Sequence, residues 1–295
     1  MTVLSLFDGL SCGQLALKKA GIVVDKYYAS EIEKAPIAMT MHNFPNTIQL
    51  GDVTKVRYEN GILYSENGEF NVGKIDIVFG GSPCQSLSNA GKGAGFSGKS
   101  GLFFEFLRIL EEVKPQYFLL ENVKMKKEWR DEITNNMKVE PILIDSALLT
   151  AQHRERYYWT NIPNLSQPVD KQIFIKDILE PSVDEKFYLS EKKVNLILSG
   201  VKYGQSQVVC DVNKKTFTLM AGMGTGGGNE PRFYDPVTNR LRRVTPLECE
   251  RLQGVDDNYT LVPYNGKPMS NCHRYKALGN GWTVDVIAHI FKGMI

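Results

Sequence analysis

One cysteine of this chain is well placed to act as a nucleophile. Cys84 follows the apolar run Ile75–Phe79 across a Gly-Gly-Ser-Pro turn. A short apolar run bounded by turn residues is typical of a buried strand, so we expect Cys84 just beyond the carboxyl end of a strand. Ligands of open α/β sheets bind at that edge. Five glycines follow and predict a loop that can close over a ligand: Gly91, Gly93, Gly95, Gly98 and Gly101.

Carboxylates follow other short apolar runs in the same half of the chain. They are Asp8 after 3–7, Glu31 after 26–30, Asp52 after 47–50 and Glu121 after 116–120. Taken singly, each could be a turn or cap residue. Together with Cys84 they occupy successive strand ends, which favours a nucleoside-containing cofactor beside a reactive thiol. Glu31 is placed to accept hydrogen bonds from ribose hydroxyls, and Asp52 from an amino group such as adenine N6.

These side chains require a sheet that brings strand ends together. Short apolar strands alternate with helical stretches through the first half, which predicts a doubly wound, mostly parallel α/β sheet. Further strands are expected at 141–144 and 156–159, and helices at 14–20, from Leu102, at 246–254 and at 283–291. The glycine turn after the first strand does not have the G-x-G-x-x-G spacing of dinucleotide-binding folds. This spacing counts against an oxidoreductase with a reactive cysteine, which stays as an alternative interpretation.

Basic residues gather at two places in the second half. Arg154 and Arg156 are two positions apart, which on a strand would point both guanidinium groups to one side. Arg240, Arg242 and Arg243 lie downstream of the glycine-rich stretch 220–228. A permissive backbone beside basic residues suits close approach to a phosphodiester chain and to base edges.

Composition sets limits on the class of protein. The chain has 295 residues and a net charge of only +2, so any nucleic-acid binding must come from local patches. The five cysteines are widely spaced and include no C-x-x-C pair, which argues against disulfides and zinc, and we expect no metal. No apolar run reaches transmembrane length and the N-terminus lacks the pattern of a signal peptide, so a cytoplasmic protein is expected.

The chain resembles the DNA cytosine-5 methyltransferases of bacteria and phages. The blocks that carry the resemblance occur in the family's order: 7–13, Glu31, 51–53, 83–85, 101–103, 121–123, 152–156, 243–248, Arg251, Gly254 and 279–280. The sequence around Leu102–Phe106 and Trp282 is also similar to that of the branch that contains the animal de novo enzymes. The resemblance implies a Rossmann-like S-adenosylmethionine-dependent methyltransferase fold with a smaller, irregular target-recognition domain. We expect a catalytic domain of 1–178 plus 275–295 and a target-recognition domain of 179–274.

The resemblance also implies the chemistry. Cys84 would add to C6 of a flipped cytosine and so activate C5, a case of covalent catalysis. Glu121 would bind N3 and the exocyclic amine, Arg156 would reach O2, and Arg154 would orient the site or a phosphate. S-adenosylmethionine would be the methyl donor, leaving S-adenosylhomocysteine as product. Double-stranded DNA would be the substrate, a cognate restriction endonuclease would be a partner, and the protein would act as a monomer.

Two sets of binding residues follow from the same blocks. The cofactor-binding set is Phe7, Asp8, Gly9, Leu10, Gly13, Glu31, Asp52, Val53, Pro83, Leu102, Asn280 and Trp282. The DNA-binding set is Ser88, Asn89, Lys92, Thr218, Leu219, Arg242 and Arg243. Two other functions inside this resemblance stay open, a catalytically silent DNA-binding relative and an RNA cytosine-5 methyltransferase. A Cys-Phe-Thr tripeptide, expected of the transfer-RNA branch, is not found in the recognition region.

Overall fold

The computed structural model describes residues 1–83, 101–199, 209–224 and 230–295. The chain folds into two compact units. The first comprises Met1–Asp145, Glu155–Gln167 and Ile287–Ile295, and the second Ser146–Arg154 and Pro168–Val286. The predicted domains, 1–178 plus 275–295 and 179–274, have other bounds: the second unit also takes in Ser146–Arg154, begins again at Pro168 and continues to Val286.

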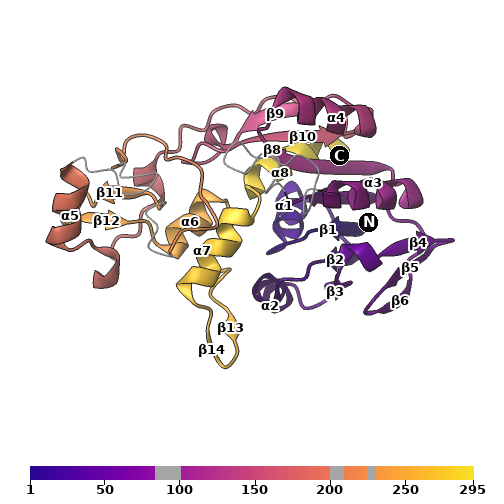
Figure 1. The fold of residues 1–295 in the computed structure, drawn as a ribbon, viewed down its shortest axis with the longest axis horizontal. Helices are drawn as coiled ribbons and strands as arrows, with labels where there is room; N and C mark the ends of the chain where they lie inside the picture. The colour runs from indigo at the N-terminus through magenta and orange to yellow at the C-terminus, as the bar shows by residue number, and fades with distance from the viewer. Residues whose placement is uncertain (84–100, 200–208, 225–229) are drawn as a thin grey trace. The chain divides into compact units, whose positions relative to one another are not determined.

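The first unit is built on a seven-stranded sheet (Figure 1). Its strands are β1 (Thr2–Leu6), β2 (Lys26–Ser30), β3 (Ile48–Gln49), β7 (Ile77–Gly81), β8 (Tyr117–Val123), β9 (Ile142–Asp145) and β10 (Glu155–Thr160). They lie in the order β3-β2-β1-β7-β8-β10-β9. Strands β3, β2, β1, β7 and β8 pair in parallel, whereas β10 runs antiparallel to β8 and to β9. The predicted mostly parallel α/β sheet is confirmed.

Helices and short segments connect these strands or follow the last of them in the chain. They are α1 (Cys12–Ala20), α2 (Lys34–Asn43), η1 (Val53–Lys55), α3 (Leu102–Val113), α4 (Lys127–Met137) and, at the C-terminus, α8 (Val284–Phe291) and η6 (Lys292–Met294). A separate three-stranded sheet, which sequence reasoning did not predict, consists of β4 (Arg57–Glu59), β5 (Ile62–Ser65) and β6 (Gly68–Asn71).

The alternation of side chains along the strands creates two apolar faces. Val78 of β7 belongs to a buried cluster with Phe103 and Phe106 of α3. The next residue, Phe79, points to the other face and stacks on Phe291, with ring centroids 5.4 Å apart. A Cβ on Gly13 of α1 would collide with the Phe79 ring, so only glycine lets this helix pack so closely. The sheet is therefore covered on both faces, and its carboxyl edge is left to the loops.

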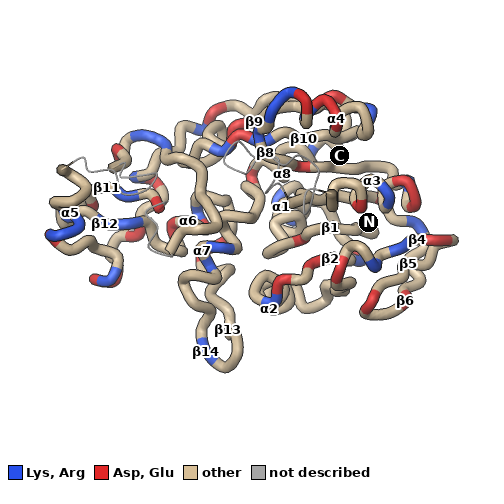
Figure 2. The backbone as a smooth tube through the Cα atoms, in the orientation of Figure 1, with Lys and Arg blue, Asp and Glu red and all other residues tan. Residues whose placement is uncertain are grey.

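The second unit has little regular structure. Its elements are η3 (Ser146–Leu148), η4 (Ile175–Ile178), η5 (Glu185–Phe187), α5 (Glu191–Leu198), β11 (Arg232–Tyr234), β12 (Leu241–Arg243), α6 (Pro246–Leu252), β13 (Pro263–Tyr264), β14 (Lys267–Pro268) and α7 (Asn271–Asn280). Strands β11 and β12 pair with each other, as do β13 and β14. In Figure 2, Lys and Arg segments mark α5 and β12.

Helix α6 shows how local sequence defines an element in this unit. The Thr245 hydroxyl accepts a hydrogen bond from the Glu248 backbone N–H, and the Glu248 carboxylate accepts one from the Thr245 N–H. This reciprocal pair is a capping box, and Pro246 fits the first helical position because it needs no N–H there. The helix predicted to start at Pro246 is thus confirmed.

Candidate active site

The first strand ends in a tight turn that the rest of the edge holds in place. Phe7 and Ser11 adopt left-handed backbone conformations, with φ of 58° and 64°. The backbone N–H of Gly9 donates to Oε2 of Glu31 at 2.8 Å, which ties the first strand end to the second. Oε1 of Glu31 accepts from the N–H groups of Ile32 and Glu33, at 2.7 and 2.8 Å. The Glu31 carboxylate is thus fixed at the edge of the sheet by three backbone donors.

The Asp8 carboxyl is turned into the protein rather than toward a ligand. It accepts hydrogen bonds from the hydroxyls of Ser5 at 2.6 Å, Tyr27 at 2.7 Å and Ser11 at 2.6 Å. Burial raises the pKa of Asp8 to about 6, although the three hydroxyls act to lower it. Burial and the Asp8 charge also raise the pKa of Tyr27 well above its usual value. These hydrogen bonds hold the turn, and the predicted contact of Asp8 with the cofactor stays a prediction.

The third strand end places Asp52 beside Glu31's strand. The Ser30 hydroxyl donates to the Gly51 carbonyl at 2.7 Å, which joins the ends of β2 and β3. Oδ1 of Asp52 accepts from the Thr54 N–H at 2.9 Å and so caps η1. An ionised carboxylate offers about four acceptor positions, so both Glu31 and Asp52 keep capacity for donors on a ligand. This acidic, acceptor-rich edge fits the amino and hydroxyl donors of an adenosyl group.

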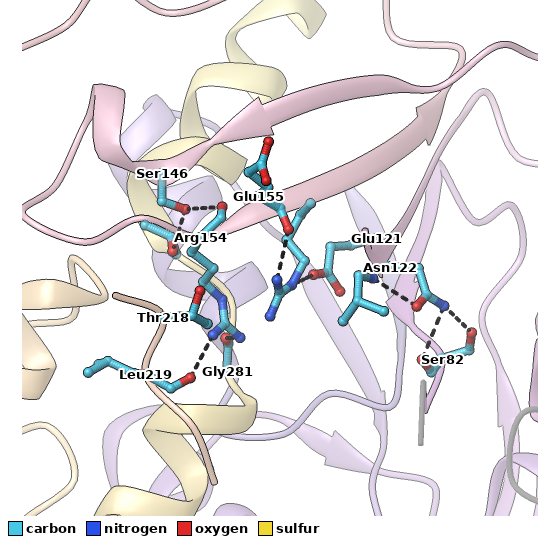
Figure 3. Close-up of polar contacts among 12 residues, drawn as sticks. Ser82, Glu121, Asn122, Ser146, Arg154, Glu155, Thr218, Leu219 and Gly281 are labelled. Atoms are coloured by element: carbon cyan, nitrogen blue, oxygen red, sulfur yellow. Dashed lines mark hydrogen bonds and ion pairs between the residues drawn. The ribbon is translucent and has the colours of Figure 1, made fainter. Parts of the chain in front are cut away.

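Glu121 and Arg156 form an ion pair where β8 and β10 meet (Figure 3). Tyr158 of β10 lies opposite Glu121 and Arg156 opposite Val123, so Arg156 and Glu121 are diagonal neighbours on one face of the sheet. Arg156 Nε lies 2.9 Å from Glu121 Oε1, and the two side chains are only 13% and 11% exposed. The guanidinium therefore holds the carboxylate in one orientation near the carboxyl end of β8.

Asn122 ties the next part of this edge to the strand that precedes Cys84. Its side-chain Nδ2 donates to the Ser82 hydroxyl at 3.2 Å, and its Oδ1 accepts from the Val123 N–H at 2.8 Å (Figure 3). Asn122 and Ser82 are both buried. The amide thus fixes the backbone immediately before Pro83, which is half-buried. Sequence reasoning assigned no role to Asn122; its place directly after Glu121 was the available signal. Cys84 itself lies outside the described residues.

The remaining predicted cofactor residues of this unit lie along the same segments. Leu10 and Val53 are buried and Leu102 begins α3. Because their side chains are enclosed, Leu10 and Val53 can offer a ligand only backbone groups. Asn280 and Trp282 belong to the second unit, where Asn280 is exposed at the end of α7 and Trp282 is half-buried.

Comparison with known proteins identifies the family of the chain. A sequence model described as C-5 cytosine-specific DNA methylase matches residues 1–295, the whole chain. The chain belongs to this family. It is 31% identical to the type II methyltransferase M1.ScrFI of Lactococcus lactis subsp. cremoris over 324 residues, covering 99% of this chain and 77% of the relative.

Other similarities extend over full lengths. The methylase is 29% identical to the type II methyltransferase M.Bsp6I of Bacillus sp. (strain RFL6), covering 100% of both chains. Among solved structures, the Entamoeba histolytica methyltransferase EhMeth has the same fold, with a TM-score of 0.77 at 17% identity over 100% of this chain and 99% of that one. Family membership makes the protein a DNA cytosine-5 methyltransferase and implies the use of S-adenosylmethionine. None of the helices in the described part of the chain is long and apolar enough to cross a bilayer.

Arg154 of the methylase organises backbone in the second unit. The spacing of Arg154 and Arg156 would point both guanidinium groups to one side only within a single strand, but β10 begins at Glu155 and Arg154 falls in the other compact unit. Its buried guanidinium donates to the carbonyls of Leu219 at 3.0 Å and Gly281 at 2.9 Å (Figure 3). It also donates to the Gly279 carbonyl at 3.2 Å. Arg154 therefore positions the backbone on both sides of Asn280.

Gln152 belongs to the same buried network and was not predicted. Its Nε2 donates to the Leu252 carbonyl at 2.8 Å and to Oε1 of Gln253 at 2.9 Å, while its Oε1 accepts from the Leu219 N–H at 3.2 Å. Because it is fully buried, both ends of the amide need partners, and the network supplies them. Gln152 and Arg154 together hold the Leu219 backbone.

The predicted DNA contacts of the methylase divide into three groups. Arg242 is wrong as a DNA contact, because it is fully buried and pairs with Glu248 at 2.7 Å and with Asp235 at 2.7 Å. Leu219 is also buried, so its side chain cannot reach DNA in this conformation. Two candidates are at least partly exposed: Thr218, whose hydroxyl donates to the His153 carbonyl, and Arg243, whose side chain is 30% exposed. Ser88, Asn89 and Lys92 lie outside the described residues.

Proposed function

We propose that this methylase transfers a methyl group to C5 of a cytosine flipped out of double-stranded DNA, through a covalent bond between Cys84 and C6. The observation that carries the proposal is the buried Glu121–Arg156 pair beside the Asn122–Ser82 clamp. The clamp fixes the backbone two residues before Cys84, and the pair supplies an oriented carboxylate on the neighbouring strand. A nucleophile and a group that polarises the base would thus be held on adjacent strands, β7 and β8.

Cytosine C5 is a poor nucleophile until a group adds to the neighbouring C6. The Cys84 thiolate would form the S–C6 bond, and the displaced electron pair would move to C5 and into the ring. Glu121 would hydrogen-bond N3 and the exocyclic amine, which favours addition by stabilising the ring in its N3-protonated form. Arg156 would keep the Glu121 carboxylate in this orientation and reach toward O2. Once C5 carries the methyl group, loss of the C5 proton to a base and cleavage of the S–C6 bond would restore aromaticity and release the Cys84 thiolate.

S-adenosylmethionine would supply an electrophilic methyl group on its sulfonium. The residues of the first unit suited to hold it are Glu31 and Asp52, whose carboxylates are fixed at neighbouring strand ends. Their acceptors match the donors of the adenosyl group, and their charge matches the sulfonium. The backbone of the Phe7–Gly9 turn, tied to Glu31, would lie under the same ligand. S-adenosylhomocysteine would leave as the product.

The two compact units suggest a division of labour. We assign the first unit to cofactor binding and chemistry, and the second to recognition of the target sequence. The reacting atoms are inaccessible inside a duplex, so the base must be extruded before Cys84 can reach it. The type II names of the relatives support a modification role beside a restriction endonuclease.

Sequencing of methylated cytosines tests the proposal. Plasmid DNA from cells that express the wild-type protein should carry 5-methylcytosine at one short repeated sequence, whereas DNA from cells with the Cys84→Ser variant should carry none. The variant should still bind S-adenosylhomocysteine, because the substitution alters only the nucleophile. Normal methylation by Cys84→Ser would refute the nucleophile assignment. Absence of methylation in both samples would favour a silent DNA-binding protein or an RNA substrate, and transfer of labelled methyl to RNA would distinguish these two.

A further inference from the structure

The small sheet β4–β6 is a part of the first unit that the mechanism above does not use. It lies in the chain between Asp52 and β7, and in Figure 1 it stands beside β2 and β3 at the edge of the large sheet. Acidic segments mark this small sheet in Figure 2. An addition of this size at the cofactor-binding side calls for a physical account.

Packing fixes the small sheet to the core. Leu63 and Val72 are buried in the main apolar cluster, and the Phe70 ring packs on Tyr28 of β2 with centroids 5.8 Å apart. The Tyr58 N–H donates to Glu112 of α3 at 2.9 Å. Because interiors are closely packed, these contacts hold the sheet, and with it the turn between β5 and β6, in one position.

That turn reaches back to the end of β3. Oε1 of Glu66 accepts a hydrogen bond from the Asp52 N–H at 2.8 Å, and Nδ2 of Asn67 donates to the Gln49 carbonyl at 3.0 Å. Gly51 has φ of +79°, and a Cβ there would collide with the Glu66 carboxylate. Glu66 therefore lies directly over the Gly51–Asp52 peptide.

Glu66 completes the support of Asp52. The Gly51 carbonyl is held by the Ser30 hydroxyl at 2.7 Å, and Asp52 uses one carboxylate oxygen to cap Thr54 at 2.9 Å. The bond from the Asp52 N–H to Glu66 fixes the peptide plane between these two contacts. With the plane fixed, the second oxygen of Asp52 has a defined direction.

We propose that Glu66 is a positioning residue for the adenosyl end of the cofactor, acting by holding the Asp52 backbone. The inference rests on the proposed placement of S-adenosylmethionine at this edge. Glu66 is exposed and lies in a turn, so the chain should tolerate its substitution without loss of the fold. Its loss should weaken the affinity for cofactor and raise KM, with kcat unchanged. The reason is that Glu66 contacts the end of β3, at one edge of the sheet, whereas the Glu121–Arg156 pair lies on β8 and β10 toward the other edge.

Titration of S-adenosylhomocysteine into the full chain by calorimetry tests the role. Glu66→Ala should raise Kd about fivefold, the effect of losing one charge-assisted hydrogen bond at an exposed site. Glu66→Gln should restore most of the affinity, because its amide oxygen can still accept from Asp52. Glu69→Ala is the matched control, an exposed carboxylate on β6 of the same sheet, and it should bind as wild type. In an Asp52→Ala background, Glu66→Ala should have no further effect.

Several results would overturn the role of Glu66. The first is an unchanged affinity for S-adenosylhomocysteine in Glu66→Ala. The second is an equal loss of affinity in Glu69→Ala. The third is a loss of affinity from Glu66→Ala that adds fully to the loss from Asp52→Ala in the double variant. A fall in kcat together with a lowered Tm would show general damage instead of positioning. If the wild-type protein binds no S-adenosylhomocysteine, the proposed function itself fails. If the wild-type protein binds it, and Asp52→Ala weakens binding while Glu66→Ala does not, only the role of Glu66 is refuted.

Discussion

Replacement of Arg242 by Met should destabilise the methylase without altering a DNA contact. The guanidinium is fully buried between Glu248, with two contacts of 2.9 and 2.7 Å, and Asp235 at 2.7 Å. Burial would by itself lower the pKa of Arg242, but the Glu248 and Asp235 carboxylates raise it. Burial acts to raise the pKa of Asp235, but the Thr238 N–H and Arg242 bring it below its usual value. Arg242 and Asp235 therefore each favour the charged form of the other.

The expected cost follows from what the substitution leaves behind. Met fills a similar volume but carries no charge, so the fully buried Glu248 carboxylate loses both hydrogen bonds to the guanidinium. Removal of one partner of a buried ion pair typically costs about 3–5 kcal/mol, because the remaining charge is buried without compensation. Arg240→Met is the matched control. Arg240 pairs with Glu185, and the two side chains are 48% and 75% exposed, so this loss should cost about 0–1 kcal/mol.

Urea unfolding and salt-dependent DNA binding separate the two roles of Arg242. The urea midpoint of Arg242→Met should fall well below that of wild type, and that of Arg240→Met should stay close to it. Among molecules that remain folded, the slope of log K against log salt should be the same for Arg242→Met and wild type, because no phosphate contact is lost. Unchanged stability with a shallower salt slope would refute the structural assignment and restore Arg242 as a DNA contact.

Two further predictions concern the first unit. Asn122→Ala should lower kcat by about tenfold or more while S-adenosylhomocysteine binding is retained, because the backbone before Cys84 loses its anchor at Ser82. Asn161→Ala is the control, because it removes similar backbone contacts at the other end of β8, and it should leave kcat unchanged. The pKa of Asp8 is raised from 3.8 to about 6, so the folded chain keeps a proton there that the unfolded chain releases. This contribution to stability is fully present below about pH 4 and is lost as the pH rises through 6. The urea midpoint of Asp8→Asn relative to wild type should therefore rise between pH 4 and 7. A difference between the two midpoints that stays constant with pH would contradict the raised pKa of Asp8.

Much of the sheet edge proposed as the active site was predictable from local signals. The strands before Asp8, Glu31, Asp52 and Glu121 are short apolar runs bounded by turn residues, and parallel pairing then brings their carboxyl ends to one edge. The predicted α/β sheet follows from the same alternation of strands and helices. The family blocks added the reaction, which periodicity cannot supply.

The roles of individual side chains at that edge were less predictable. Asp8 and Arg242 are charged residues in sequence positions that suggest ligand contact, yet both bind internal partners: Asp8 accepts from three hydroxyls, and Arg242 pairs with two buried carboxylates. Whether a charge faces a ligand or a neighbouring residue depends on which hydroxyls and carboxylates the fold brings within 3 Å, and these come from distant positions such as Tyr27 and Glu248. Asn122 was missed for the same reason, since its partner Ser82 belongs to another strand.

The sequence by itself determined the parallel strands of the large sheet, the family and therefore the reaction, because apolar periodicity, turn residues and family blocks are local in the chain. Only the tertiary structure decided that Arg156 grips Glu121, that Arg154 holds carbonyls in a separate unit, and that Glu66 supports Asp52. The physical reason is that each of these depends on a hydrogen bond or ion pair between elements, whose geometry is fixed by strand register and packing and is not encoded in any one segment.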